Sequence, residues 1–238
     1  MRFEFATMTA LAALLTAVST PAVAAEAAAA DSGADVDQRT IVVTGAKDGY
    51  APKDTTVAKI PAELRDIPQA VNVVPEEVLR DQRALSIQDA LKNVPGVGMS
   101  HGDGQRDQVT IRGFSAISDQ FVDGFRDDAL YFRDLSNVAR IEVVKGPAAV
   151  LYGRGSSGGL INRVTRKPGE NVASFTLSAG SWNTKRGEFD VGRVLAGGDA
   201  AFRLTGALER SGSFRQFQFL DRETISPSML LRPGADTE

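Results

Sequence analysis

The C-terminal part of the chain alternates apolar and polar side chains with a period of two, which restricts it to half-buried β-strands. The alternation starts at about residue 172 and extends over four runs. The apolar positions are Ala173, Phe175, Leu177 and Ala179, then Phe189 and Val191, then Phe202, Leu204 and Leu208, and finally Ile225, Met229 and Leu231. Hydroxyl and charged residues occupy most positions between them. The pattern predicts an antiparallel sheet with one apolar face.

Two folds contain such a sheet, and the alternation alone does not choose between them. Residues 180–183 and 197–199 predict short turns, and residues 211–221 predict a longer polar and aromatic connection. Strands of ~10 residues joined by short and long turns in rotation are typical of outer-membrane barrels. A soluble antiparallel sandwich has the same alternation. An export signal and the absence of cysteine favour the barrel.

The first 24 residues have the parts of a secretory signal peptide. Arg2 supplies positive charge, residues 5–18 are an apolar run, and Ala22-Val23-Ala24 offers a cleavage site. The run is shorter than the ~20 residues of a membrane-spanning helix, so a membrane anchor is the weaker interpretation. We expect residues 1–24 to be a signal peptide and residues 25–60 to form a flexible leader.

Composition excludes several classes of function. The 238-residue chain has no cysteine and a single histidine, His101, which disfavours thiolate sites, His-based metal sites and catalytic triads. The formal net charge of −3 argues against nucleic-acid binding, which needs a clustered basic excess. Residues 153–158 fit G-x-G-x-x-G, but a strand is expected to follow where a dinucleotide site needs a helix. We therefore expect no enzyme, no resident metal or cofactor, and no nucleic-acid partner.

Residues 61–168 predict a compact domain of short helices and strands. Strands are expected at residues 70–74, 109–113, 120–123, 141–145 and 160–164, and the 120–123 strand is expected to end in an Asp123-Gly124 turn. Pro75 suits the first turn of a helix, and the two acids after it suit the positive end of the helix dipole. Ser86 and Asp89 have the spacing of a capping box for a second helix that ends near Lys92. Because every element is short, the domain should gain stability from being enclosed.

A short β-prone run, Thr40-Ile41-Val42-Val43-Thr44-Gly45, precedes this domain. An isolated strand of this length is not stable alone. It is either an ordinary first strand of the domain, which spacing alone slightly favours, or a segment that adds a strand to a partner's sheet.

Several segments, in order, resemble the plug domain of TonB-dependent siderophore receptors. The opening segments are Ile67-Pro68-Gln69-Ala70-Val71, Asp89-Ala90-Leu91 and Val94-Pro95-Gly96-Val97. The central segments are Ile111-Arg112-Gly113-Phe114, Val122-Asp123-Gly124, residues 140–148, residues 150–155 and residues 158–162. Residues 125–134 are most similar to the ferric-catecholate and ferrichrome-type branch.

The resemblance implies a mixed α/β plug domain at residues 61–168, followed by the first strands of a transmembrane antiparallel β-barrel at residues 169–238. In this family a barrel of ~22 strands encloses the plug. The implied protein is an outer-membrane receptor of a Gram-negative bacterium that imports ferric siderophores. TonB, with the inner-membrane ExbB and ExbD complex, would pair with a TonB box at Thr40–Gly45 and pull, so that the plug opens. Iron would arrive already chelated, and outer-membrane lipid would surround the barrel.

Two sets of site residues follow from the resemblance. Ferric catecholates are anionic and aromatic, which suits arginine and aromatic side chains. The expected ligand-facing residues are Arg106, Arg126, Tyr131, Phe132 and Arg133, and the alternative is a solvated or barrel-contacting loop. Arg112 and Lys145 align with basic plug positions that latch onto acidic residues of the barrel wall in relatives, and the alternative is packing polarity.

Two other functions compete with import. A signalling transducer would carry an extra folded domain between the export signal and the TonB box, where this chain has only a short leader. A secreted plug-like module, or a non-inserting truncated product, is the other alternative. Four strands cannot close a barrel, so we expect a truncated part of a longer receptor.

Overall fold

The computed structural model describes residues 50–52, 55–57, 59, 63–100, 104, 106–155, 157–195 and 199–232, which all belong to one unit of the chain. The predicted signal peptide, the predicted TonB box at Thr40–Gly45, and His101 lie outside the described residues. Within the described ranges, no helix has the length and apolar character needed to cross a membrane.

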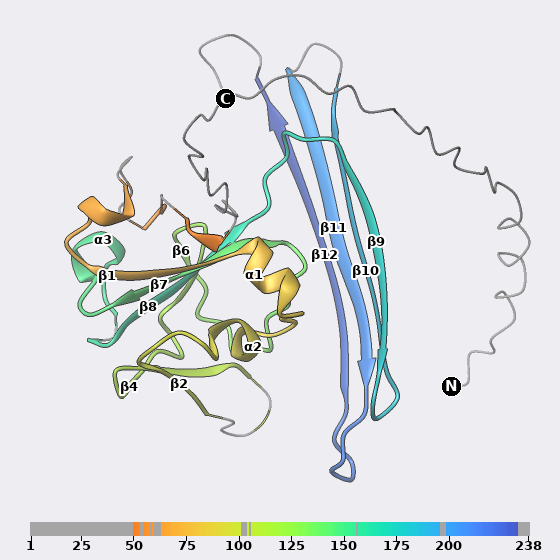
Figure 1. Ribbon diagram of the computed structural model, residues 1–238, viewed down its shortest axis with the longest axis horizontal. Helices are drawn as coiled ribbons and strands as arrows, with labels where there is room; N and C mark the ends of the chain where they lie inside the picture. The colour runs from red at the N-terminus through yellow and green to blue at the C-terminus, as the bar shows by residue number, and fades with distance from the viewer. Residues whose placement is uncertain are drawn as a thin grey trace, which may run out of the picture. The chain divides into compact units, whose positions relative to one another are not determined.

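A five-stranded sheet forms the centre of the α/β domain, in the order β1-β7-β8-β5-β6. Its strands are β1 (Ala70–Pro75), β5 (Gln120–Val122), β6 (Phe125–Arg126), β7 (Val138–Lys145) and β8 (Gly159–Thr165). β5 and β8 are parallel, and the other pairs are antiparallel. Figure 1 shows β1, β7 and β8 side by side. The predicted strands at residues 70–74, 120–123, 141–145 and 160–164 are confirmed.

Both faces of this sheet are covered. Successive side chains of a strand point to opposite faces, so Val143 and Val144 of β7 enter different apolar clusters. The larger cluster includes Ile111, Ile141 and Ile161 and the two helices that follow β1. The smaller one consists of Val57, Phe121, Val144, Ala148 and Leu160.

The helices are as short as the sequence predicts. They are α1 (Glu76–Asp81), α2 (Ile87–Leu91), α3 (Ala149–Tyr152) and a 3-10 turn η2 (Leu64–Asp66). Pro75 is the N-cap of α1. Both halves of the predicted capping box of α2 form, because Ser86 Oγ accepts from Asp89 N and the Asp89 carboxylate accepts from Ser86 N. The sequence did not predict α3 or η2.

A small second sheet packs below the helices. Its strands are β2 (Val97–Ser100), β3 (Gln108–Ile111) and β4 (Phe114–Ser115), in the order β2-β3-β4. β3 was expected from the alternation at residues 109–113, but β2 was not. The strand β3 ends where Arg112 and Gly113 both adopt positive φ.

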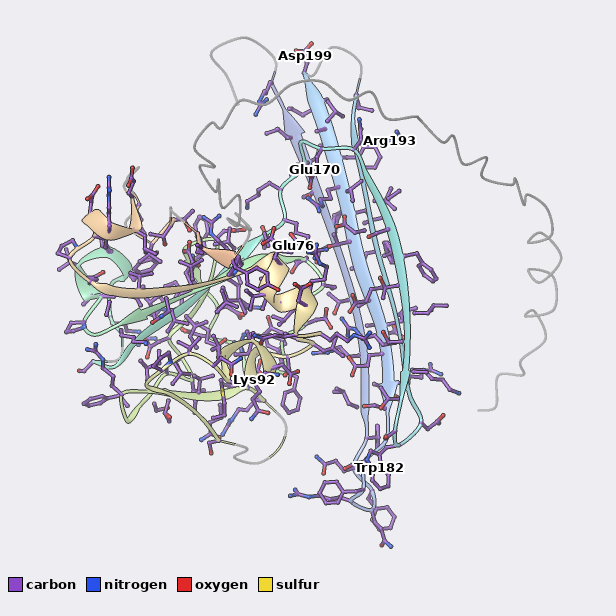
Figure 2. All side chains as sticks on the ribbon, viewed as in Figure 1. Glu76, Lys92, Glu170, Trp182, Arg193 and Asp199 are labelled. Atoms are coloured by element: carbon purple, nitrogen blue, oxygen red, sulfur yellow. The ribbon has the colours of Figure 1, made fainter. Side chains whose placement is uncertain are left out.

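Four long strands follow as an antiparallel meander in the order β12-β11-β10-β9 (Figure 1). They are β9 (Val172–Gly180), β10 (Thr184–Val194), β11 (Ala200–Ser211) and β12 (Leu220–Leu231). Trp182 lies at one end of the strands and Asp199 at the other (Figure 2), as a meander with alternating turns requires.

The two faces of the meander are the reverse of those of a soluble sheet. Phe175, Leu177 and Ile225 are exposed, whereas Arg186, Arg203 and Glu209 are buried on the opposite face. A sandwich buries its apolar face and exposes its polar one. A membrane barrel turns its apolar face outward and its polar face inward. This inversion decides between the two folds that the alternation left open, in favour of barrel strands.

The turn between β5 and β6 is the Asp-Gly hairpin that the sequence predicts. Asp123 and Gly124 have φ of 50° and 82°, as a two-residue turn with both residues left-handed requires. The Asp123 carboxylate accepts from Thr165 N (3.0 Å), Thr165 Oγ1 (2.6 Å) and Lys167 Nζ (2.8 Å). It therefore fixes the hairpin to the end of β8.

Acid should weaken this turn. Burial acts to raise the pKa of Asp123, but the hydrogen bonds from Lys167 and Thr165 outweigh it and hold the pKa below the ordinary value of 3.8. A group with a lowered pKa stabilises the fold above its unfolded pKa, and the contribution is lost as pH falls through the folded value. We expect the unfolding free energy of Asp123→Asn, which keeps a residue tolerant of positive φ, to converge on that of the wild type as the pH falls below the folded pKa of Asp123. Denaturant titrations between pH 2.5 and 7 measure this, and a constant difference between the proteins would contradict it.

Candidate functional site

The 125–134 loop, which holds most of the predicted ligand-facing residues, is organised around a buried arginine. Arg133 is 1% exposed. Its Nε donates to Asp127 Oδ2 (3.0 Å), and its Nη2 donates to the carbonyl oxygens of Ala129 (2.7 Å) and Asp127 (3.1 Å). Its backbone N–H donates to Asp107 Oδ2 (2.9 Å). The expectation that Arg133 faces a ligand is therefore corrected: its guanidinium is buried and shapes the loop from within.

The other predicted residues of the loop lie nearer the surface. Arg126 Nη1 donates to Ser118 O (2.6 Å), and the guanidinium stacks 4.8 Å from the centre of the Phe121 ring. Tyr131 is exposed, and its hydroxyl donates to Asp127 Oδ2 (2.9 Å). Phe132 is half-buried. The most exposed apolar side chains of the loop are Phe125 and Leu130, which are not among the ligand-facing residues predicted from the sequence.

Arg106 belongs to the same neighbourhood. The backbone beside it is joined to the loop because Asp107 N donates to Tyr131 O (3.2 Å). Arg106 is therefore next in sequence to a residue that bonds the loop holding the other four, and Arg133 is buried within that loop.

Two carboxylates that bond Arg133 have pKa values shifted in opposite directions. Burial acts to raise the pKa of Asp127, but Arg133, the Tyr131 hydroxyl and Arg163 hold that pKa below its usual range. Burial raises the pKa of Asp107, and the bonds from Arg133 only partly offset it. Asp127 is thus the charged partner that holds Arg133 and Arg163, both of which form ion pairs with it.

The two predicted latch residues also lie together. A side-chain atom at Gly146 would be 3.5 Å from Arg112 Nη1, so this guanidinium reaches the residue next to Lys145. Burial lowers the pKa of Lys145, and the charge of Arg112 lowers it further. Within the described part of the chain, neither side chain forms an ion pair. Two adjacent cations of this kind form a site that an acidic group would stabilise.

Charged side chains on the polar face of the meander hold the α/β domain. Arg186 of β10 is buried and donates to Asp134 through Nη1 (2.7 Å) and Nη2 (3.1 Å), and to Glu209 (2.7 Å). It also pairs with Glu188. Arg222 of β12 bonds Glu209 (2.7 Å), the Arg133 carbonyl oxygen (3.1 Å) and Asp134 (3.0 Å). These five charged side chains (Asp134, Arg186, Glu188, Glu209 and Arg222) form the Asp134 cluster.

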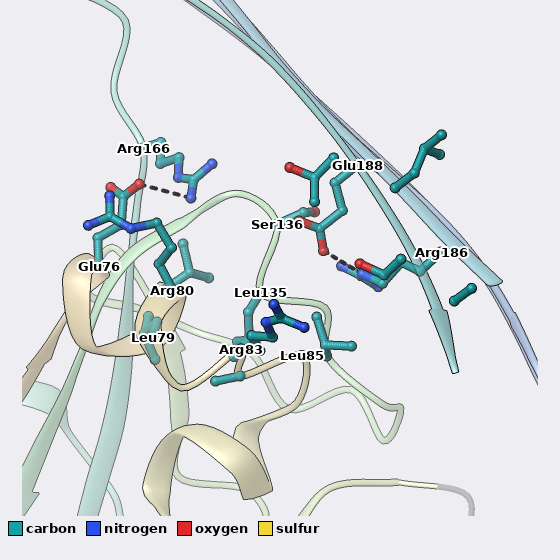
Figure 3. Close-up of a pocket in the computed structure, with 16 residues that line it drawn as sticks. Glu76, Leu79, Arg80, Arg83, Leu85, Leu135, Ser136, Arg166, Arg186 and Glu188 are labelled. Carbon is teal, nitrogen blue, oxygen red and sulfur yellow. Dashed lines mark hydrogen bonds and ion pairs between the residues drawn. The ribbon is translucent and has the colours of Figure 1, made fainter. Parts of the chain in front are cut away.

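A second cluster fixes the connection between the domain and the meander. Arg166 pairs with Glu76 of α1 (3.0 Å) and with Asp190 of β10 (2.9 Å). Asp190 also pairs with Arg203 of β11 (2.8 Å), which in turn reaches Glu170 (2.8 Å). The two clusters border a cavity of about 510 Å³ between the domain and the sheet, where the pairs Arg166–Glu76 and Arg186–Glu188 are visible in Figure 3.

Neither cluster was predicted from the sequence. The signal was present, because several polar positions of the alternating runs hold charged residues (Arg186, Glu188, Asp190, Arg203 and Glu209) where hydroxyl residues would suffice. A charge that is costly to bury indicates a specific partner. Which residues of the domain are those partners is not visible in the sequence.

An α/β domain tied by buried ion pairs to the polar face of a meander, whose apolar face is bare, has the architecture of a plug domain with adjoining barrel strands. Residues 63–160 match the model of the TonB-dependent receptor plug domain. Through residues 63–160 the chain belongs to the TonB-dependent receptors, as the sequence resemblance predicted.

Related proteins support this assignment over most of the chain. The catecholate siderophore receptor Fiu of Escherichia coli is 33% identical over 217 residues, which are 88% of this chain and 28% of Fiu. The metal-pseudopaline receptor CntO of Pseudomonas aeruginosa is 34% identical over 92% of this chain and 32% of its own length. The crystal structure of the closed form of Fiu matches with a TM-score of 0.72 and 31% identity, over 78% of this chain and 27% of Fiu. The chain thus spans about a quarter to a third of the length of these relatives.

Proposed function

We propose that the protein is a TonB-dependent outer-membrane receptor that imports ferric siderophores. The observation that carries the proposal is a plug domain bound to the polar face of strands whose apolar face suits lipid. Such a sheet is stable where hydrocarbon covers the apolar side and the domain covers the polar side. The location proposed is therefore the outer membrane of a Gram-negative bacterium.

The proposed energy source is TonB. The outer membrane has no ATP, so work has to arrive mechanically. Thr40–Gly45 is the proposed TonB box, a β-prone run that can add a strand to a partner's sheet. TonB, with ExbB and ExbD in the inner membrane, would pull on this segment. Arg112 and Lys145 are the proposed latch that holds the plug to acidic residues of the wall until then.

The proposed ligand class is an anionic metal chelate, with ferric catecholates favoured. Phe125 and Tyr131 of the 125–134 loop are exposed, and Arg126 adds a guanidinium to the loop that is 21% exposed and pairs with Asp119 and Asp128. Such a surface suits an anionic aromatic chelate. The names of the relatives are consistent with this class, because they include a catecholate receptor and a metal-pseudopaline receptor.

Uptake of labelled chelates tests the function. Cells that express the protein should accumulate iron from at least one of a panel of catecholate, hydroxamate and mixed ferric siderophores, and only when TonB is present. No TonB-dependent uptake from any of them would contradict the proposal. Uptake of haem or cobalamin alone would show that the ligand is not a ferric siderophore, and TonB-dependent import would still stand.

Replacing Arg126 and Tyr131 together by alanine should weaken chelate binding. Each cation–π or stacking contact contributes about 0.5–2 kcal/mol, so we expect the loss of both to raise the Kd by roughly 5- to 700-fold. Arg133 is kept, because its removal would collapse the loop. Lys92→Ala is the matched control, since it removes an exposed positive charge from another part of the domain (Figure 2). Quenching of intrinsic fluorescence gives the Kd, and equal affinities of all three proteins would exclude the loop as a binding surface.

A further inference from the structure

The segment that follows the proposed TonB box is held by a buried carboxylate of the plug. Glu142 is 0% exposed. Its Oε1 accepts from Thr56 N (2.9 Å), and its Oε2 accepts from Thr56 Oγ1 (2.8 Å). Thr56 is 86 residues away in sequence, so both groups of this one residue bond to a single distant carboxylate.

The same carboxylate is anchored in the centre of the plug sheet. Its two other donors are Arg140 Nε (2.9 Å) on the same strand and Asn162 Nδ2 (3.0 Å). Glu142 and Asn162 face each other in register on β7 and β8. Burial acts to raise the pKa of Glu142, but the bonds from Thr56, Asn162 and Arg140 outweigh it and lower that pKa. The group therefore stays charged, with all its donors within the domain.

Thr56 itself is exposed, but the residue after it is buried. Val57 is 0% exposed and packs in the smaller apolar cluster, against Phe121 and Val144. Its carbonyl oxygen accepts from the Tyr152 hydroxyl of α3 (3.1 Å). Polar bonds and apolar packing thus hold two consecutive residues on one face of the sheet.

Thr56 and Val57 lie shortly after the proposed TonB box in the sequence. Thr56 lies 11 positions after Gly45, which is a span of at most about 40 Å in extended chain. Tyr50, which lies between them, is exposed, and its hydroxyl donates to Asp81. Among the described residues, Thr55 and Val57 are the first with buried side chains. Among the described residues, tension applied at residues 40–45 would therefore first pull on buried side chains at Thr55 and Val57.

We propose that Glu142, Asn162 and Tyr152 form a clamp on Thr56 and Val57, and that its opening is the first internal step of plug rearrangement. The role in transport rests on the proposed function, but the clamp itself does not. Asn162 adds a connection to the ligand side, because its Oδ1 accepts from Gly124 N (3.0 Å) in the hairpin that leads into the 125–134 loop. One amide therefore contacts both the clamp and the hairpin that carries the proposed ligand residues.

Thiol labelling measures clamp opening directly, because the chain contains no native cysteine. Val57→Cys places a thiol at a buried position. In detergent-solubilised protein without TonB, a maleimide should label it slowly, and Thr56→Val should speed labelling on the order of 10-fold through the loss of one charged hydrogen bond. Glu142→Gln should speed it on the order of 100-fold, because the amide has one acceptor oxygen and opposes two donors.

Two controls separate clamp opening from other effects. Glu223→Gln makes the same carboxylate-to-amide change at an exposed position of β12 and should leave the rate unchanged. Val143→Cys, at a buried position in the middle of β7, should remain protected in Thr56→Val, which shows that the sheet stays folded. Equal labelling of Val57→Cys with and without Thr56→Val would overturn the clamp.

A second arm in cells tests the role in transport. During uptake of a chelate, Val57→Cys should be labelled in cells that have TonB and protected in cells that lack it. Protection of the thiol while TonB-dependent uptake proceeds would overturn the inference and leave the proposed function intact. Absence of TonB-dependent uptake, with fast labelling of the Thr56→Val protein in detergent, would reject the proposed function and keep the clamp.

Discussion

Val43→Pro should abolish import of a ferric chelate and leave chelate binding unchanged. Val43 lies in the middle of the β-prone run Thr40–Gly45, the proposed TonB box. Proline has no backbone N–H, so it removes a ladder hydrogen bond from any strand pair that this run forms with TonB. Because the energy of import would pass through that pair, we expect the uptake rate to fall to the level of cells without TonB. Accumulation of labelled chelate in energised cells measures this.

The control is Val43→Thr, which keeps the N–H and a β-branched side chain of nearly the same shape. This variant should retain most of the uptake. Both variants should bind the chelate with the wild-type Kd, because the change lies outside the plug. Normal uptake by Val43→Pro would show that residues 40–45 do not couple the protein to TonB.

The parts of the fold that could be predicted from the sequence are those set by local patterns. The capping box at Ser86 and the Asp-Gly turn at Asp123 are short-range chemistry, and both form as expected. The alternation from residue 172 predicted the four long strands, because a period of two survives whichever face is buried. The period does not show whether the apolar face points to lipid or to a protein core, because both environments select the same alternation.

Long-range polar contacts account for most of what the sequence could not predict at the candidate site. Arg133 stands in a polar, charged loop, where exposure is the usual expectation for arginine. It is buried because Asp107, 26 residues earlier, and Asp127 close around it. Thr56 and Glu142 are likewise joined across 86 residues by a bond that leaves no periodic signal. The same holds for Asp134 and Arg186, whose bond connects the plug to the barrel strands.

The Asp134–Arg186 bond leads to the largest stability effect that we expect. Arg186 is buried and bonds Asp134 twice, Glu209 once, and also Glu188. Arg186→Ala would leave three acidic side chains with Arg222 as the remaining cation of the Asp134 cluster. Removing one partner of a buried ion pair typically costs about 3–5 kcal/mol, because the other charge stays buried without compensation. We expect a loss of this size in the unfolding free energy of the protein in detergent.

Arg193→Ala is the matched control, because Arg193 lies on the same strand β10 and its side chain is exposed (Figure 2). It should change the unfolding free energy by less than about 0.5 kcal/mol. A double-mutant cycle then separates plug docking from strand stability. If Arg186 acts mainly by binding the plug, Asp134→Asn should cost much less in the Arg186→Ala protein than in the wild type. Additive costs would show that Arg186 stabilises the strands alone, and the plug would then be held to them by the Arg166 and Asp190 pairs.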